Sequence, residues 1–187
     1  MKILNYVKGK LFPVKKSPKK IAIIMRAIPG SGKSTMAKMI RDAVIGVGLK
    51  SSIHSSDENF MINGKYCFDQ SKLGYYHKLN LYNFTQALAS DDVVISDNTN
   101  IKRRDYMLYV NAAKSAGFKV IAVSFAPGAA TMHHSRNVHS VPLDVIERMK
   151  AAFTPTTDQV DEQYTMLCDD GAIDSEYVKC IIKAIIS

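Results

Sequence analysis

The sequence predicts an α/β fold in which a parallel sheet of four to five strands is flanked by helices. Short apolar runs alternate with segments of helical spacing over most of the chain. A glycine-rich loop separates the first apolar run from the first helical segment. With 187 residues, 47% of them hydrophobic and 22% charged, the chain is sufficient for one domain with a proper core. Such alternation implies parallel pairing through right-handed crossovers.

The strands of this sheet are recognised by continuous apolar residues, because a strand that is covered on both faces has no polar side. The first run, Ile-Ala-Ile-Ile-Met, is the clearest of them, and the second is more polar. The predicted strands span residues 21–25, 51–55, 93–96 and 119–125.

The helices are predicted where apolar residues recur at three- and four-residue spacing. Asp69 is a predicted N-cap, Gly117 follows a predicted helix end, and Asn63-Gly64 is a turn signal. The predicted helices span residues 34–47, 70–88, 102–116, 127–136 and 142–153. We expect residues 127–141 to form a helical lid and residues 154–187 a C-terminal extension of the domain that starts at residue 21.

Residues 1–20 are predicted to form a basic, flexible leader. They contain seven lysines and no acidic residue, whereas the other 167 residues carry 18 basic and 17 acidic side chains. The net charge of +8 therefore belongs mainly to the leader. Two interpretations are open: an arm that attracts polyanions such as nucleic acid, or a solvated tail.

Membrane insertion and secretion are not expected for this sequence. No apolar run approaches the roughly 18 residues of a membrane-spanning helix. The three cysteines are odd in number and lack metal-ligand spacing, which favours a reducing, cytoplasmic environment.

A phosphate-binding loop follows the first strand. In Ala27-Ile28-Pro29-Gly30-Ser31-Gly32-Lys33-Ser34-Thr35, the glycines let backbone N–H groups converge, and the next helix adds positive potential at its N-terminus. Only the first position, alanine here, departs from the strict pattern. The chemistry predicts ATP and Mg²⁺ as ligands, with the lysine on the outer phosphates and the serine hydroxyl on Mg²⁺. The predicted cradle is Pro29, Gly30, Ser31, Gly32, Lys33, Ser34 and Thr35.

Two carboxylates follow strands and should lie beside this loop at the carboxyl edge of the sheet. Asp97 is predicted to orient Mg²⁺ through water or to hold the loop itself. Asp57 has two interpretations: a general base that accepts the proton of an attacking hydroxyl, or, with Ser56, a cap for a short helix.

The lid should supply a cation for the transferred phosphoryl group, and Arg136 is the candidate. The alternative is an arginine paired on a helix surface. Three neighbouring histidines, His133, His134 and His139, lack a carboxylate or cysteine partner at metal-ligand spacing. We interpret them as solvated lid residues.

These motifs resemble the kinase domain of phage polynucleotide 5′-hydroxyl kinase. They resemble still more the polynucleotide kinase-like domain, of the AAA_33 type, in animal proteins that bind a HECT ubiquitin ligase. The resemblance covers about residues 21–153 and rests on the order and spacing of several motifs. The matching segments are residues 30–35, 56–57, 68–69, 93–100, 136–139 and 141–149, together with Leu73, His77 and Asn80.

The resemblance implies a P-loop kinase with a helical lid. Lys33 and Ser34 would hold ATP and Mg²⁺, Asp57 would be the general base and Arg136 a lid arginine on the donor phosphates. The phage enzyme has an acceptor-binding arginine where Phe60 stands, and a second lid arginine where this chain has Ser140. Phe60 is either a base-stacking residue or part of the core.

Several further residues are candidates for binding the acceptor. His77 and Asn80 match the family, but they also fit a buried polar pair. Arg103 and Arg104 are basic residues at the start of a helix, which either grip acceptor phosphates or are solvated. The candidates are Phe60, His77, Asn80, Asp97, Asn98, Arg103 and Arg104.

Three functions are consistent with these observations. The first is an ATP-dependent kinase acting on a polynucleotide hydroxyl, foremost the 5′ end of DNA or RNA, with nucleic acid as partner. The second keeps the donor site and phosphorylates a nucleoside, a small metabolite or a hydroxymethylated DNA base. The third is a non-catalytic, nucleotide-gated binding module.

Overall fold

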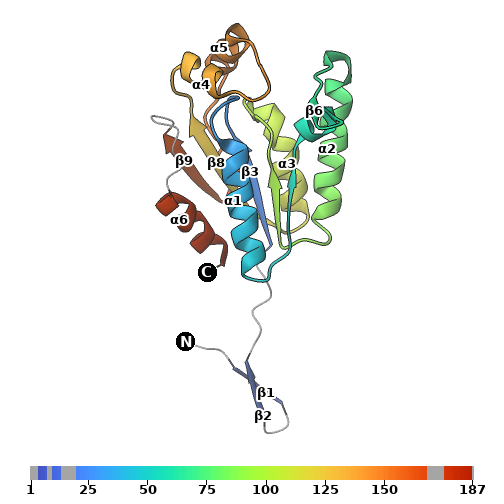
Figure 1. The fold of residues 1–187 in the computed structure, drawn as a ribbon. Coiled ribbons are helices and arrows are strands. Elements are labelled where there is room, and N and C mark those ends of the chain that lie inside the picture. The colour runs from blue at the N-terminus through green and yellow to red at the C-terminus, as the bar shows by residue number, and fades with distance from the viewer. Residues whose placement is uncertain (1–3, 8–9, 14–19, 168–174, 187) are drawn as a thin grey trace.

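The computed structural model describes residues 4–7, 10–13, 20–167 and 175–186. Its centre is a five-stranded sheet in the order β4-β7-β3-β8-β9, with every neighbouring pair parallel (Figure 1). The predicted parallel α/β architecture is therefore confirmed. The strands are β3 (Ile21–Arg26), β4 (Ser51–His54), β7 (Val93–Ser96), β8 (Lys119–Ala126) and β9 (Glu162–Leu167).

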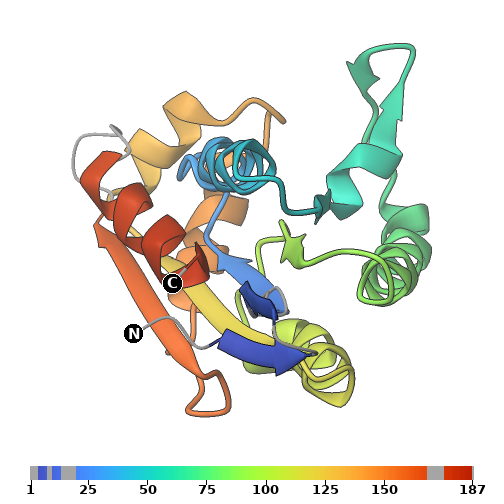
Figure 2. The same cartoon turned by 90° about the horizontal axis from the view of Figure 1, so that it is seen from below.

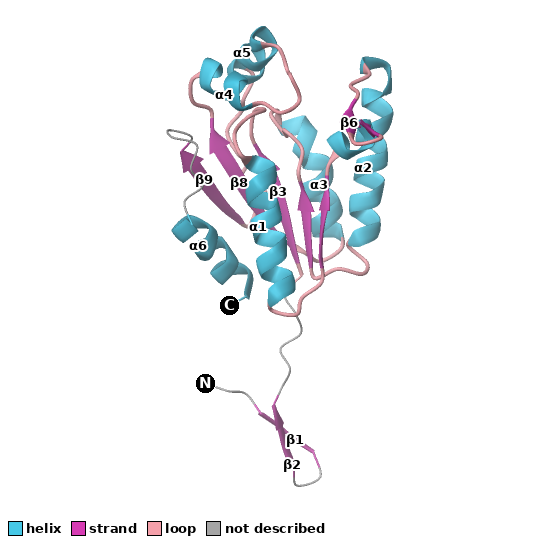
Figure 3. Cartoon of the chain, viewed as in Figure 1, coloured by secondary structure: helices cyan, strands magenta, loops and turns pink. Residues whose placement is uncertain are grey.

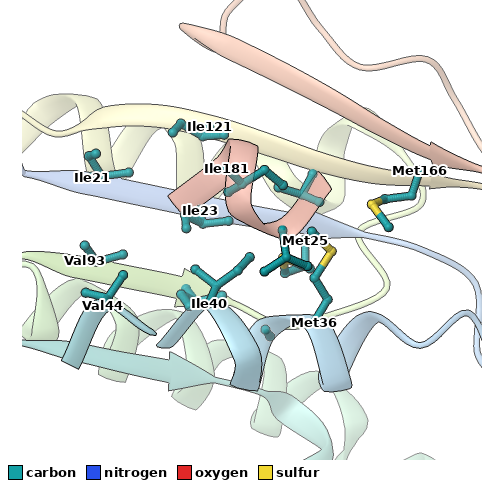
Figure 4. Packing of buried hydrophobic residues seen from close by; sticks show 14 of the residues in the cluster. Ile21, Ile23, Met25, Met36, Ile40, Val44, Val93, Ile121, Met166 and Ile181 are labelled. Carbon is teal, nitrogen blue, oxygen red and sulfur yellow. The ribbon is translucent and has the colours of Figure 1, made fainter. Parts of the chain in front are cut away.

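Helices cover both faces of this sheet, as the view from below shows (Figure 2). In β3, Ile23 and Met25 point to the first face, where they pack against Met36 and Ile40 (Figure 4). Ile24 points to the opposite face. The first face is covered by α1 (Lys33–Gly46) and α6 (Ser175–Ile186), the second by α2 (Leu73–Ala87) and α3 (Arg103–Ser115).

The sequence patterns follow from this burial. All six residues of β3 are buried, which explains its unbroken apolar run. The four residues of the edge strand β4 are only half-buried, which explains its polarity. Predicted and observed boundaries agree within a few residues (Figure 3).

Three pairings were not predicted. Within the C-terminal extension, β9 forms the fifth strand of the sheet and α6 packs beside α1. Within residues 1–20, β1 (Leu4–Val7) and β2 (Lys10–Pro13) form an antiparallel pair. A third pair, β5 (Met61–Ile62) and β6 (Lys65–Tyr66), surrounds the predicted Asn63-Gly64 turn, where both residues have positive φ.

Short helices carry the functional loops at the carboxyl edge of the sheet. Above this edge, α4 (Ala130–Arg136) and α5 (Leu143–Ala151) pack on each other in the region predicted as the lid (Figure 1). Two 3-10 turns, η1 (Ser56–Phe60) and η2 (Gln70–Lys72), precede α2. Asp69 caps the second turn by accepting a hydrogen bond from the amide of Ser71, as predicted. Among the described residues, no helix combines the length and apolarity that a bilayer crossing requires.

Candidate active site

The phosphate-binding loop has the predicted geometry. It connects β3 to α1, and both Gly30 (φ 79°) and Gly32 (φ 81°) adopt the left-handed conformation that glycine favours. No side chain caps the N-terminus of α1, which lies wholly within the described residues. Its first N–H groups are therefore oriented toward the loop and remain for a ligand.

Lys33 and Asp97 form a buried ion pair at the base of this loop. The ammonium of Lys33 also donates to the backbone carbonyl of Asp97 at 3.1 Å. Asp97 lies at the carboxyl end of β7, so the pair joins the loop to the neighbouring strand. Of the two predicted roles for Asp97, this contact corresponds to holding the loop.

A cavity of about 590 Å³ connects the phosphate loop to the second carboxylate. Lys33, Asp57 and Arg136 all contribute to its walls. The segment from Pro29 to Thr35 forms one end, and Tyr66, Phe68, Leu73 and His77 form the other. The structure therefore brings the predicted donor residues and the predicted base to one cavity.

Asp57 faces this cavity with 44% of its side chain exposed. The hydroxyl of Tyr66 donates to Oδ1 of Asp57 at 3.3 Å, and Nε2 of His139 lies 3.9 Å from Oδ2. Burial, followed by the Asp57 carboxylate, raises the pKa of Tyr66, so this phenol stays protonated as a donor. The helix-cap interpretation of Ser56-Asp57 is wrong, because Ser55 caps η1 through its bond with the Asp57 amide.

Aromatic side chains line the part of the cavity that lies away from the phosphate loop. Phe60 is 1% exposed and packs behind these side chains. Its ring centroid lies 5.2 Å from that of Phe68 and 5.9 Å from that of Tyr66. Phe60 is thus core rather than a stacking residue. Phe68, 54% exposed and on the cavity wall, has the exposure that stacking requires. No sequence signal separated these two phenylalanines, because only the fold decides which one is covered.

A polar network holds the segment that carries Asp57. Asn98 accepts a hydrogen bond from the Ser56 amide and donates to the Tyr109 hydroxyl at 3.0 Å. Asn80 is buried and donates to the same hydroxyl. His77 lies on the cavity wall, with Nδ1 2.9 Å from the Ser56 hydroxyl. The structure therefore places Asn98 and His77 at the cavity and Asn80 in the core.

The basic residues at the start of α3 do not reach the cavity. Arg103 and Arg104 are exposed, and Arg104 pairs with Asp105 at 3.7 Å. The carboxylate of Asp105 also accepts from the Lys102 amide and so satisfies the helix N-terminus. These arginines are not part of the cavity, and Asp105 offsets their unfavourable position on the helix dipole.

The lid histidines occupy three different environments. His134 is exposed, as expected for a solvated residue, whereas His133 is fully buried and His139 is half-buried against Tyr66. In His133, Nε2 accepts from the Gly128 amide and Nδ1 lies 3.3 Å from the Ser31 hydroxyl. The prediction of solvation is thus wrong for His133, because the lid helix packs directly on the phosphate loop. Among the described residues, no group of three metal-ligating side chains occurs.

Burial sets the charge of His133. It lowers the pKa of the ring, outweighing a backbone hydrogen bond with Gly30, and the cations Arg136 and Lys150 lower it further. The ring is therefore neutral, and its proton must lie on Nδ1 because Nε2 accepts a hydrogen bond. A neutral Nδ1–H facing Ser31 and Gly30 fastens α4 to the loop.

Comparison with known families assigns this arrangement. A model of the AAA domain (AAA_33) matches residues 23–156, which include most of β3, the phosphate loop, Asp57, Asp97 and Arg136. The chain belongs to this AAA-domain family. The AAA domain accounts for most of the sequence and for the whole candidate site.

Curated relatives contain this AAA domain within much longer proteins. The chain is 32% identical over 137 residues to human NEDD4-binding protein 2, covering 69% of this chain and 7% of that protein. It is 28% identical over 155 residues to rat YLP motif-containing protein 1, covering 71% of this chain and 11% of the relative. The chain therefore spans about a tenth or less of the length of these relatives.

Solved structures show that the AAA domain has a P-loop kinase-like fold. Kti12 from Chaetomium thermophilum, in complex with ADP-AlF3, superimposes with a TM-score of 0.63 at 15% identity, covering 89% of this chain and 99% of that one. APS kinase CysC from Mycobacterium tuberculosis, in complex with AMPPNP and APS, gives 0.59 at 15% identity, covering 91% and 99%. A gluconokinase from Sinorhizobium meliloti gives 0.54 at 15% identity, covering 90% of each chain.

The residues of the AAA domain fit a nucleoside triphosphate with Mg²⁺. The uncapped N-terminus of α1 and the ammonium of Lys33 suit phosphate oxygens, and the exposed Ser34 suits a hard cation. Asp97 pairs with Lys33 and so holds the loop that would receive the phosphates. The residues that would hold the triphosphate and the cation thus lie together at the phosphate loop.

Proposed function

We propose that this AAA domain is an ATP-dependent, Mg²⁺-requiring kinase that phosphorylates a hydroxyl of a polynucleotide, foremost the 5′-hydroxyl of DNA or RNA. One observation carries the proposal. Asp57 and the phosphate loop with Lys33 line the same cavity, with aromatic side chains at its far end. This cavity has a place for a triphosphate, for an alcohol beside a carboxylate and for the base of a nucleotide.

The reaction follows from this placement. The acceptor oxygen forms a bond to the γ-phosphorus while the bond from that phosphorus to the bridging oxygen of ADP breaks in line, and the proton of the acceptor passes to Asp57. Tyr66 holds the carboxylate through its hydroxyl. Lys33 and the loop amides hold the donor phosphates, and the exposed Arg136 faces the same space from the lid. A bound Mg²⁺ neutralises charge on the transferring group.

The acceptor end of the cavity supports a nucleotide at the reacting terminus. Phe68 presents an exposed ring, and stacking of a base on such a ring contributes about 1–3 kcal/mol. The resemblance of the site motifs to polynucleotide 5′-hydroxyl kinases supports the same acceptor.

A second candidate is a kinase for a nucleoside or another small alcohol. It is favoured by one observation: Phe60 occupies the position of an acceptor-phosphate arginine and is buried, so no cation stands there. An acceptor without a phosphate near its reacting hydroxyl needs no cation at this position.

Transfer of labelled γ-phosphate from ATP to single-stranded DNA, single-stranded RNA and nucleosides tests the proposal. Labelling of the strands at the 5′ end is the expected result. For Asp57→Asn we expect kcat to fall about 10²- to 10⁴-fold, because the general base is lost, while the affinity for ATP stays within about two-fold.

Asp42→Asn on α1 is the matched control, since it removes an exposed carboxylate outside the cavity. It should leave kcat unchanged. Transfer to nucleosides alone would replace the first candidate with the second. Unchanged turnover in Asp57→Asn would remove Asp57 from the chemistry.

A further inference from the structure

The outer face of α2, defined by Tyr75, Lys78 and Tyr82, combines exposed aromatic and basic side chains. Tyr75 is 65% exposed and Tyr82 is 60% exposed, and Lys78 between them is exposed as well. Their spacing of three and four residues places them on one side of the helix. Asn80 and Phe84, on the opposite side, are buried against the sheet. Packing of α2 therefore does not account for the two tyrosines.

The charge around this face favours a polyanion. Residues 70–90 contain no aspartate or glutamate, and Lys78 is exposed. Lys72 is exposed as well, but it pairs with Asp69 at 3.4 Å and so adds no uncompensated charge. Among the described residues, no carboxylate lies within ion-pair distance of Lys78. The exposed faces of α1 and α3, by contrast, carry Asp42 and Asp105 beside their cations. The outer face of α2 is thus positive and lacks internal charge compensation.

The first turns of α2 separate this face from the acceptor end of the cavity. Phe68, Leu73 and His77 line the cavity around the start of α2. From Phe68, ring contacts continue through Phe60 and Tyr76 to Tyr75, with centroid separations of 5.2, 4.7 and 5.8 Å. The helix then runs away from the carboxyl edge along the outside of the domain (Figure 1). Leu73 and His77 lie on the side of α2 that carries Asn80 and Phe84, so an acceptor that leaves the cavity past Phe68 has to pass around the first turns of the helix to reach Tyr75.

The dimensions suit a short stretch of single strand. Seven residues separate Tyr75 from Tyr82, which corresponds to about 10 Å along a helix. Three stacked nucleotides occupy about the same length. Aromatic platforms with interspersed cations are how proteins hold single strands irrespective of sequence, with bases on the rings and phosphates on the lysines.

We propose that the outer face of α2 is a binding track for the single-stranded nucleic acid whose 5′ terminus occupies the cavity. Tyr75 and Tyr82 stack on bases downstream of the reacting nucleotide, and Lys78 contacts the phosphate between them. This proposal rests on the polynucleotide acceptor proposed above and extends it. It implies that affinity increases with strand length, which a nucleoside kinase would not show.

The test compares strands that reach the track with strands that do not. The double variant Tyr75→Ala/Tyr82→Ala should weaken the binding of a 3′-labelled oligothymidylate of about twelve nucleotides by about ten-fold or more in fluorescence anisotropy. Its KM for the same strand should rise to a similar extent. With a nucleoside 3′-monophosphate as acceptor, kcat and KM should stay within about two-fold, because this acceptor has no base downstream of the reacting nucleotide.

Charge and ring character are tested separately. Lys78→Glu should lower the affinity for the long strand. It should also reduce the slope of log K against log salt by about 0.7, the value for one phosphate contact on a single strand. Lys38→Glu on α1 changes the net charge by the same amount and should have no such effect. This control shows whether a change in overall charge is sufficient to weaken binding. Tyr75→Leu keeps apolar bulk without the aromatic ring and should lose part of the affinity, whereas Ile45→Ala on α1 should lose none.

The outcomes separate the two proposals. Unchanged binding and KM of the long strand in the double variant would overturn the track, even if strands are phosphorylated. Weaker binding together with absence of transfer to any strand would support the track and overturn the kinase assignment. Equal losses with the long strand and the nucleoside 3′-monophosphate would indicate a damaged cavity and would also overturn the track.

Discussion

Arg26 is a cation inside the protein without a carboxylate partner among the described residues. Its side chain is fully buried, and it donates to the carbonyls of Asn100, Ile101 and Thr154 and to the hydroxyl of Thr156. The guanidinium also lies over the ring of Tyr106 at 4.3 Å. These contacts join the end of β3 to the segments after β7 and after α5. Arg26 therefore ties both segments to the end of β3.

Replacing Arg26 with lysine should destabilise the protein although the charge is kept. An ammonium cannot satisfy acceptors in several directions at once, so at least one buried carbonyl loses its donor. We expect the free energy of unfolding to fall by about 2–4 kcal/mol in chemical denaturation. Arg41→Lys, at an exposed surface pair with Asp42, should change it by less than about 0.5 kcal/mol. Equal effects would mean that the buried network is not stabilising.

At the level of single residues, the sequence predicted chemistry better than burial. The loop glycines and the positions of Asp57 and Asp97 after strands follow from local patterns, and the structure has them at one edge of the sheet. The solvated environment predicted for His133 was wrong because burial depends on a contact between α4 and the loop, about a hundred residues apart in the chain. Phe68 was missed for the same reason.

Contact between lid and loop is the main feature at the scale of elements. A Cβ atom at Gly30 would lie 2.1 Å from the carbonyl oxygen of His133, so only glycine permits this approach. His133 adds the contact with Ser31. The position of α4, and with it Arg136, is thus coupled to the conformation that binds phosphates.

Gly30→Ala tests this coupling. The substitution adds the strain of a positive φ, about 1–2 kcal/mol, and also a clash with the lid backbone. The expected results are a loss of stability beyond that strain and a rise in KM for ATP of about ten-fold or more, because loop and lid must separate.

Gly64→Ala is the matched control for that variant. Gly64 has φ 77°, but nothing lies within 4 Å of a Cβ there. It should show the strain alone and leave KM for ATP unchanged. If both variants behave alike, close packing of the lid does not matter for binding.

Buried histidines make the folded state sensitive to mild acid. Burial lowers the pKa of His133 and of His54, whereas the unfolded residues titrate near about 6.5. Below that pH the unfolded chain binds more protons than the folded one, so stability falls as pH falls. We expect the free energy of unfolding to decrease between about pH 7 and pH 5, by at most about 1.4 kcal/mol per pH unit for each histidine.

His133→Gln should reduce this slope in denaturant titrations across that range, since glutamine does not titrate. His134→Gln removes the exposed neighbour and should leave the slope as in the original chain. An unaltered slope in His133→Gln would show that folding does not lower the pKa of His133.

The sequence revealed the central strands more readily than the edges of the sheet. β3, β7 and most of β8 are buried on both faces and are therefore continuously apolar. In β9, by contrast, Gln163 and Thr165 are exposed while Met166 is buried, so the strand has no apolar run to mark it. Its place is decided by pairing with β8, which no local pattern contains.

For the whole molecule, the distribution of charge is uneven in a way that bears on the proposed acceptor. Seven of the 25 basic residues lie within the first twenty positions, and the remainder is nearly neutral. If the leader is an arm for polyanions, it adds long-range attraction, whereas the proposed track on α2 adds contacts at defined positions. The two contributions differ in their response to salt and to strand length.

Deleting residues 1–20 separates these contributions. Affinity for a single strand of about twelve nucleotides should fall, and the slope of log K against log salt should decrease by about 0.7 for each lysine that contacts a phosphate. Turnover of a dinucleotide should persist, because the cavity lies entirely within residues 28–149. The loss should occur equally in the wild-type chain and in Tyr75→Ala/Tyr82→Ala, since arm and track share no residue. A salt slope that does not change on deletion would identify the lysines as a solvated tail and leave strand binding to the folded domain.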